Sequence, residues 1–120
     1  MTLLSSVLWA EPLSAKRLHK EVVYQSMWCT RVGGKTEVVL PDKTRVDCLT
    51  SEYAIEFDFG SKWAESIGQA LYYSLQTGKK AGIVLILEKA SDYKYWLRLN
   101  KVVNGANLPI KTWAMAPKDL

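Results

Sequence analysis

The feature that most constrains the fold is a continuous apolar segment, Gly82 to Leu87, which follows a helical pattern over residues 62–77. An uninterrupted apolar strand is typical of the interior of a sheet that is covered on both faces. An alternating strand pattern over residues 53–59 precedes the helix, so a helical crossover separates the two strands. This connection predicts that the strand at 82–87 pairs in parallel with the strand at 53–59.

Residues 14–30 carry apolar side chains at steps of three and four, which predicts an amphipathic helix. Its apolar positions are Leu18, Val22, Val23 and Met27. Ser14 is a candidate for the helix cap, and the glycine pair at 33 and 34 is typical of a helix end. We expect the apolar positions to form the buried face of this helix.

The remaining patterns complete one domain, because 120 residues leave room for no second one. Strands are expected at 36–40 and 44–49 around a Pro41-Asp42-Lys43 turn, a helix at about 93–103, and a short strand at 110–115. The predicted class is α/β, with an α+β mixed sheet in the order α-β-β-β-α-β-α-β. The domain spans residues 14–115, and residues 116–120 form a tail.

Cys29 and Cys48 lie 19 positions apart, which fits neither a CxxC redox pair nor a four-ligand zinc site. One interpretation is a disulfide that joins the end of the first helix to the second strand. The other is a pair of buried free thiols. A bond predicts a periplasmic or secreted protein, and free thiols predict a cytoplasmic one.

Residues 1–10 bear on the same question, because a short apolar run ends there in a small residue. They resemble a clipped export signal, yet no Lys or Arg precedes the run. Residues 1–13 are therefore either a remnant signal or an apolar arm that packs on the domain. Nowhere does the chain approach the ~20 consecutive apolar residues that a membrane span needs.

Acidic side chains gather on two neighbouring strands. Strand alternation places Glu56 and Asp58 on one face, about 7 Å apart, and the short connection brings Asp47 near them. Three converging carboxylates are typical ligands of Mg²⁺ or Mn²⁺, which would polarise a phosphate and activate a bound water. Alternatively, they are solvated residues on the open face of an antiparallel sheet.

The order of these elements, with Asp47 in the second strand and Glu56 in the third, resembles the PD-(D/E)XK nuclease superfamily of restriction endonucleases and Holliday-junction resolvases. The resemblance covers residues 14–88 and implies a restriction endonuclease-like α-β-β-β-α-β core, here with an additional helix and a short C-terminal strand. In the family a lysine stands two residues after the second acidic residue, a position held here by Asp58. Some members tolerate an acidic residue there, and others supply a lysine from the following helix, for which Lys62 is the candidate.

The resemblance also assigns supporting residues. Glu21 matches the acidic residue that some resolvases contribute from the first helix, as a further metal ligand. Family members often carry a Gln-x-x-x-Tyr pattern on the crossover helix. Here Gln69 begins that pattern, Tyr73 has its spacing, and Tyr72 lies nearer the polar face, so Gln69 and Tyr72 are expected to support the site.

The implied function is a metal-dependent nuclease that acts on DNA or RNA, with DNA preferred and Mg²⁺ or Mn²⁺ as cofactor. The net charge of +4 is compatible with an anionic partner. The residues expected to hold phosphates are Lys16, Arg17, Lys20, Lys79 and Lys80. The alternative is a non-catalytic nuclease-like domain that binds nucleic acid or a protein. Homodimer formation is open in both cases.

Overall fold

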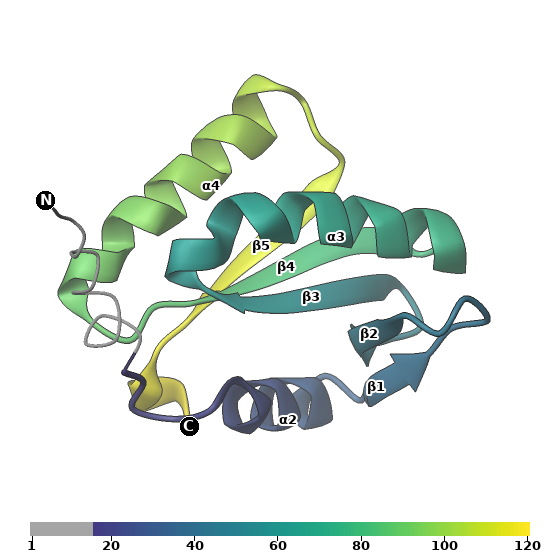
Figure 1. Cartoon of the computed structure of the whole chain (residues 1–120), viewed down its shortest axis with the longest axis horizontal. Coiled ribbons are helices and arrows are strands. Elements are labelled where there is room, and N and C mark those ends of the chain that lie inside the picture. The colour runs from purple at the N-terminus through teal and green to yellow at the C-terminus, as the bar shows by residue number, and fades with distance from the viewer. Residues whose placement is uncertain (1–15) are drawn as a thin grey trace, which may run out of the picture.

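A computed structural model describes residues 16–120. Over this range the chain folds into a five-stranded mixed sheet with three α-helices (Figure 1). The strands are β1 (Lys35–Val39), β2 (Arg45–Leu49), β3 (Tyr53–Phe59), β4 (Lys80–Ile86) and β5 (Ile110–Met115), and the helices are α2 (Glu21–Arg31), α3 (Trp63–Thr77) and α4 (Tyr93–Gly105). Short 3-10 turns are η2 (Gly60–Lys62), η3 (Ala90–Asp92) and η4 (Pro117–Asp119). The predicted arm or export signal at 1–13 lies outside the described residues.

The sheet follows the chain order β1-β2-β3-β4-β5. The first three strands are antiparallel, whereas β3, β4 and β5 run in parallel. Every residue of β3 pairs with one of β4, from Tyr53 opposite Lys80 to Phe59 opposite Ile86. The α3 crossover therefore produces the predicted parallel pair, and β4 lies in the sheet interior between β3 and β5. This confirms the mixed-sheet class.

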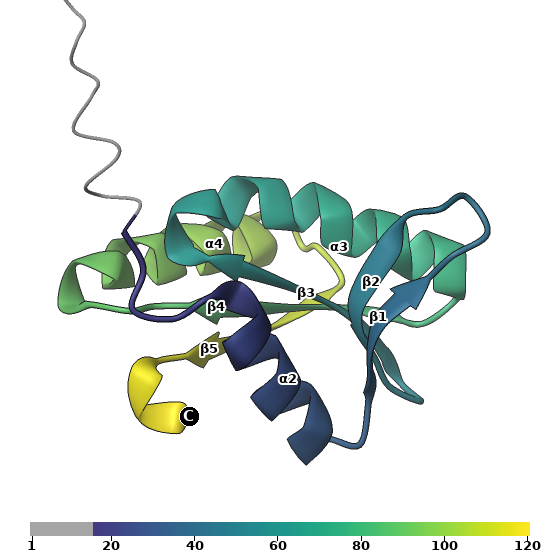
Figure 2. The same ribbon diagram turned by 60° about the horizontal axis from the view of Figure 1, so that its bottom comes forward.

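Helices cover both faces of the sheet. Figures 1 and 2 show α3 and α4 on one face and α2 on the other. Beneath α2 lies a cluster that includes Tyr24, Phe57 and Ile86, and beneath α3 and α4 lies a second one that includes Ile83 and Leu99. The interior of β4 is buried on both sides, as its apolar run predicts. From residue 16 onward, no helix combines the length and the apolar character needed to cross a membrane.

The first helix differs from its prediction in extent and in face. Residues 16–20 are not helical, and α2 begins at Glu21. The apolar positions expected in the core are exposed, namely Leu18, Val22, Val23 and Met27. The buried residues are Tyr24, Gln25 and Cys29. The prediction failed because hydrogen bonds decide the face: the Tyr24 hydroxyl donates to Glu88 at 2.7 Å, and Gln25 donates to two neighbouring strands.

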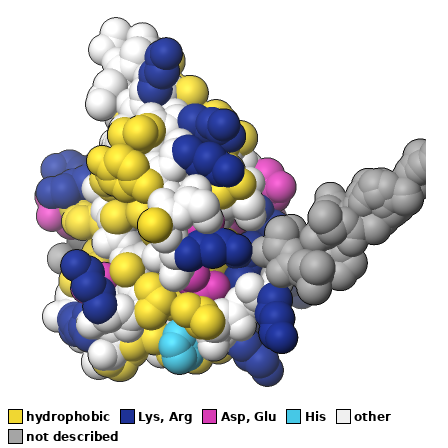
Figure 3. All heavy atoms as spheres, turned by 90° about the vertical axis from the view of Figure 1, so that its left-hand side faces the viewer, with side chains coloured by type: hydrophobic (Ala, Val, Ile, Leu, Met, Phe, Trp, Pro, Cys, Tyr) yellow, Lys and Arg dark blue, Asp and Glu magenta, His cyan; other side chains and the backbone are white. Residues whose placement is uncertain are grey.

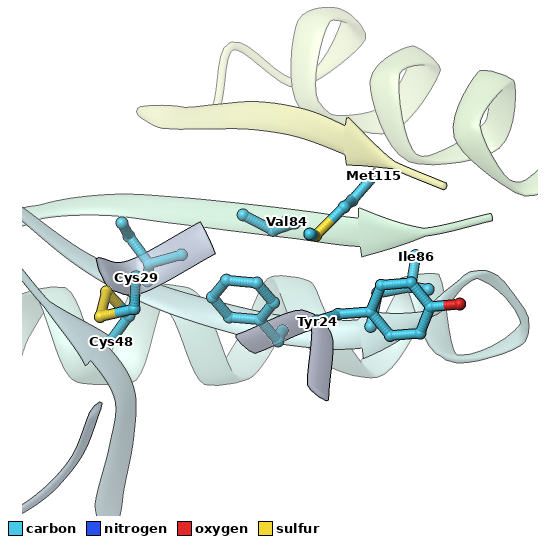
Figure 4. Close-up of a cluster of buried hydrophobic side chains, with 8 residues drawn as sticks. Tyr24, Cys29, Cys48, Val84, Ile86 and Met115 are labelled. Atoms are coloured by element: carbon cyan, nitrogen blue, oxygen red, sulfur yellow. A yellow bond between two sulfur atoms is a disulfide. The ribbon is translucent and has the colours of Figure 1, made fainter. Parts of the chain in front are cut away.

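Cys29 and Cys48 form the predicted disulfide, with their Cα atoms 5.8 Å apart. Figure 4 shows the bond at one end of the buried cluster that also contains Tyr24 and Val84. Gly34 lies directly against it: a Cβ atom there would be 2.7 Å from one sulfur and 2.8 Å from the other. The disulfide thus fixes the end of α2 to β2, and the close approach of the chain at Gly34 requires glycine.

Candidate functional site

The site begins where β2 and β3 separate. Their pairing stops at Cys48 opposite Ile55, although β2 continues to pair with β1. Beyond that point the backbone N–H of Phe57 has no strand partner in β2, and it donates instead to the Asp47 carboxylate at 2.7 Å. A buried N–H needs an acceptor, so the divergence of the strands fixes Asp47 in the fork between them.

Glu56 lies between two other carboxylates in this fork. Glu56 is 6% exposed, and Asp47 and Asp58 are its acidic neighbours. Burial, together with the charges of Asp47 and Asp58, raises the pKa of Glu56 to about 11. Glu56 is therefore a protonated acid at neutral pH.

Asp58 carries the clearest sign of a missing partner. It is 8% exposed, and its Oδ2 atom is buried without a hydrogen-bond partner among the described residues. Burial raises the pKa of Asp58 to about 6, while Glu56 and Lys62 act to lower it. A buried carboxylate oxygen without a donor or a cation is costly, and such costs are typical of functional sites.

Two residues complete the site from other elements. Glu21, the first residue of α2, is half-buried, and burial together with Asp47 and Asp58 raises its pKa to about 7. Lys62, at the end of η2, is exposed and lowers the pKa of both Glu21 and Asp58. The structure therefore brings together five of the residues singled out from the sequence: Glu21, Asp47, Glu56, Asp58 and Lys62.

Sequence reasoning missed Gln25 and Glu37. Gln25 is 2% exposed and donates to Glu37 Oε2 at 2.7 Å and to the backbone oxygen of Asp47 at 3.0 Å. Glu37 has a φ of 54° and pairs with Arg45 at 3.1 Å. Gln25 follows Glu21 by four residues, which places both on one face of the helix. That spacing was the available signal, whereas nothing in the sequence indicates the left-handed backbone of Glu37.

The supporting residues of α3 differ from the prediction. The hydroxyl of Tyr72 donates to Asp42 in the turn between β1 and β2, and Gln69 is exposed. The structure instead puts Tyr73 beside the carboxylates, since Glu56 and Asp47 add to burial in raising its pKa. Tyr73 also packs against the buried cluster of Leu40, Val46 and Ala54. The residue at the family spacing is thus the one that faces the site, and Tyr72 is corrected to a contact with the hairpin turn.

The predicted basic residues fall into two groups. Arg17 lies 4.0 Å from the centre of the Phe59 ring and donates to Ser61 Oγ at 3.3 Å, so it lies beside the end of β3. Lys16 and Lys20, its neighbours in sequence, are exposed. Lys79 and Lys80 lie at the start of β4, opposite Tyr53, which is roughly 16 Å along the strand from Asp58. There they contact Ser51 and Glu52. Lys79 and Lys80 are therefore far from the carboxylates.

The donor set fits a hard divalent cation in its chemistry. Across residues 16–120, no group of three or more His, Cys, Asp and Glu side chains is already arranged to hold a metal ion. Instead, Glu56 is protonated at neutral pH, because burial and the charges of Asp47 and Asp58 raise its pKa. Loss of that proton would leave carboxylate oxygens only, which Mg²⁺ and Mn²⁺ prefer, and the unpartnered Oδ2 of Asp58 is one of them.

Comparisons with known proteins add no relative: no family model, no curated protein and no solved structure matches this chain.

Proposed function

We propose that the protein is a metal-dependent nuclease on a PD-(D/E)XK-like fold, which hydrolyses phosphodiester bonds in DNA or RNA. The observation that carries the proposal is the buried trio of Asp47, Glu56 and Asp58 in the fork of β2 and β3, with one Asp58 oxygen left without a partner. Replacement of such a trio by apolar residues would relieve the burial of charge, so its presence favours a functional role.

The order of elements supports the nuclease class. α2, β1, β2, β3, α3 and β4 follow one another as in the core that the sequence resembles. Asp47 lies in the second strand and Glu56 in the third, and β4 pairs in parallel with β3. The acidic residues thus occupy the elements on which the family resemblance rests.

Asp47, Glu56 and Asp58 would hold Mg²⁺ or Mn²⁺, with Glu21 as a further ligand or as a base. When bound, the cation supplies a Lewis acid for the phosphate and lowers the pKa of a coordinated water. The rest of the chemistry belongs to side chains. Glu21, whose pKa is about 7, is suited to accept a proton from an attacking water at neutral pH.

Lys62 places a positive charge next to the carboxylates, where it would stabilise the negative charge that develops on a phosphate in the transition state. Two hydrogen bonds hold Asp47 in place beside Lys62. The backbone N–H of Phe57 donates to the Asp47 carboxylate, and the side chain of Gln25 in α2 donates to the Asp47 backbone oxygen. The site is therefore positioned by buried hydrogen bonds before any substrate arrives.

The test is cleavage of plasmid, single-stranded and branched substrates with Mg²⁺ or Mn²⁺. We expect the wild-type protein to cut at least one of them, and Asp47→Asn and Glu56→Gln to reduce the rate by roughly 100-fold or more. Glu52→Gln is the matched control, because it neutralises an exposed carboxylate at the far end of β3. Circular dichroism verifies folding. Equal cleavage by wild type and Asp47→Asn would refute the proposal.

A second candidate is a non-catalytic domain of the same fold that binds nucleic acid or a protein. The observation in its favour is Asp58 at the position where the family carries lysine. The same substrates distinguish the two functions: binding of an oligonucleotide in EDTA, without cleavage in Mg²⁺ or Mn²⁺, favours the non-catalytic domain.

A further inference from the structure

α4 differs from the other helices in charge. Its charged residues are Lys94, Arg98 and Lys101, and no carboxylate occurs between Tyr93 and Gly105. All three side chains are exposed, and none forms an ion pair within residues 16–120. The spacing of four and three residues places them along one side of the helix. α4 therefore presents a basic surface of three exposed cationic side chains along one side.

This surface adjoins the candidate site through Tyr95. The cationic groups of Lys94 and Arg98 lie 5.1 Å and 5.6 Å from the centre of the Tyr95 ring. The same ring packs on Gly60, where a Cβ atom would be 3.0 Å from it. Gly60 stands midway in sequence between Asp58 and Lys62. The two cations are thus held beside the segment that carries the carboxylates.

A cavity of about 350 Å³ opens at the first turn of α4. Its polar lining includes Lys89, Lys118 and the acidic residue Glu88, and Tyr93 and Leu87 are among the apolar residues. Leu87 also packs on Gly60. Tyr93 is 55% exposed, although it is a large aromatic residue. Figure 3 shows that basic side chains are spread over this side of the molecule, with hydrophobic side chains among them. An exposed aromatic ring with lysines beside it is typical of sites that stack an unpaired base.

We propose that the first half of α4 and this cavity bind an unpaired stretch of nucleic acid, with its phosphates on Lys94 and Arg98 and a base against Tyr93. The inference rests on the proposed nuclease function and names the form of its substrate. Lys79 and Lys80, at the opposite end of the β3–β4 pair and in contact with Ser51 and Glu52, do not take part.

An anionic membrane is the competing partner for a basic helix with exposed apolar side chains. The exposed apolar residues of α4 are Tyr93, Leu97 and Val102, and they alternate with cations and polar groups rather than forming one apolar face. The two cations also lie against Tyr95, which packs on Gly60 next in sequence to the candidate site, and a phosphate of a nucleic acid is the anion expected there. Both observations favour nucleic acid.

The experiment measures binding of a fluorescent single-stranded oligonucleotide in EDTA, so that no cleavage occurs. We expect Lys94→Glu/Arg98→Glu to weaken binding at least tenfold and to lower the logarithmic salt dependence by about 1.4, for two lost phosphate contacts. Tyr93→Ala should weaken binding of the single strand about tenfold and binding of a duplex of the same length by less than twofold. Lys79→Glu/Lys80→Glu carries the same change in charge and should bind within twofold of the wild type.

Folding of each variant is verified first. If Lys94→Glu/Arg98→Glu does not fold, Lys94→Gln/Arg98→Gln is measured in its place. Equal weakening by the α4 pair and the control pair would overturn the inference, as would tighter binding to duplex than to single strands. If Lys94→Glu/Arg98→Glu lost binding to phosphatidylserine vesicles but kept binding to the oligonucleotide, α4 would be a membrane-binding helix and the inference would be wrong. Metal-dependent cleavage by an α4 variant that binds like the wild type would leave the proposed function standing and remove this inference.

Discussion

The Asp47 carboxylate accepts a hydrogen bond from the backbone N–H of Phe57 at 2.7 Å, at the point where β2 leaves β3. Because Phe57 is the residue between Glu56 and Asp58, this single contact sets Asp47 against both. The carboxylates are therefore brought together by the backbone of β3, and their mutual repulsion is the consequence. That repulsion, added to burial, is the origin of the raised pKa of Glu56.

Asp47→Asn tests the coupling between these carboxylates. The amide oxygen still accepts from the Phe57 N–H, but the negative charge next to Glu56 is gone. We expect the pKa of Glu56 to fall from about 11 by roughly 1 pH unit or more. An NMR titration of the side-chain carboxyl carbons measures it. Glu52→Gln should leave the Glu56 titration unchanged, and an unchanged midpoint in Asp47→Asn would contradict the account.

Glu56→Gln is expected to stabilise the metal-free protein at pH 7. The pKa of Glu56 is raised in the folded state, so ionisation favours the unfolded chain once the pH exceeds its ordinary pKa of 4.5. The amide cannot ionise and removes this penalty, which we place at about 1–3 kcal/mol at pH 7. Urea denaturation measures the difference in the free energy of unfolding.

The sign of this effect depends on pH. Below pH 4.5 Glu56 is protonated in both states, so wild type and Glu56→Gln should have similar stability there. From pH 4.5 upward the wild type loses stability relative to the variant, until the folded-state pKa is passed. A stability difference that is constant from pH 4 to pH 8 would show that the effect does not come from ionisation.

Binding of Mn²⁺ should release protons. Glu56 is protonated at neutral pH, and Glu21, with a pKa of about 7, is partly so, yet both must ionise to act as metal ligands. We therefore expect the affinity for Mn²⁺ to increase from pH 6 to pH 8. Calorimetry in buffers of different ionisation enthalpy counts the protons. Absence of proton release upon binding would place the metal elsewhere.

Reduction of the Cys29–Cys48 disulfide should destabilise the domain by about 3 kcal/mol, since it closes a loop with a sequence separation of 19. The urea midpoint should fall by roughly 1–2 M on addition of a reducing agent. Cys29→Ala/Cys48→Ala is the control, in which the reducing agent should have no effect. Thiol titration of the denatured, unreduced protein should find no free thiol, and two free thiols would contradict the bond.

Most of the fold could be predicted because its centre depends on one long-range pairing, that of β3 with β4. The apolar run at 82–87 and the crossover helix define β3, α3 and β4, whose pairing follows from the rules for parallel strands. α2 failed because its buried face includes polar side chains. Tyr24 and Gln25 are buried by bonds to Glu88 and Glu37, which are distant in sequence, while Val22 and Val23 remain exposed.

The candidate site was predictable as far as strand alternation reaches. Alternation places Glu56 and Asp58 on one face, and the short connection brings Asp47 near them. The sequence does not show that β2 leaves β3 after Cys48, so the bond from Phe57 and the burial of the trio could not be foreseen. Which of Tyr72 and Tyr73 lies nearer the carboxylates depends on the rotation of α3 against the sheet, which the sequence does not show. In the structure the Tyr72 hydroxyl donates to Asp42 in the hairpin turn instead.

The most direct test of the central claim is anomalous diffraction from crystals soaked in Mn²⁺ at pH 8. We expect a peak in the fork of β2 and β3, within about 2.3 Å of carboxylate oxygens that include Asp58 Oδ2. The same soak of Glu56→Gln should give a weaker peak. A fork without a peak after the soak would contradict the assignment of these carboxylates as a metal site.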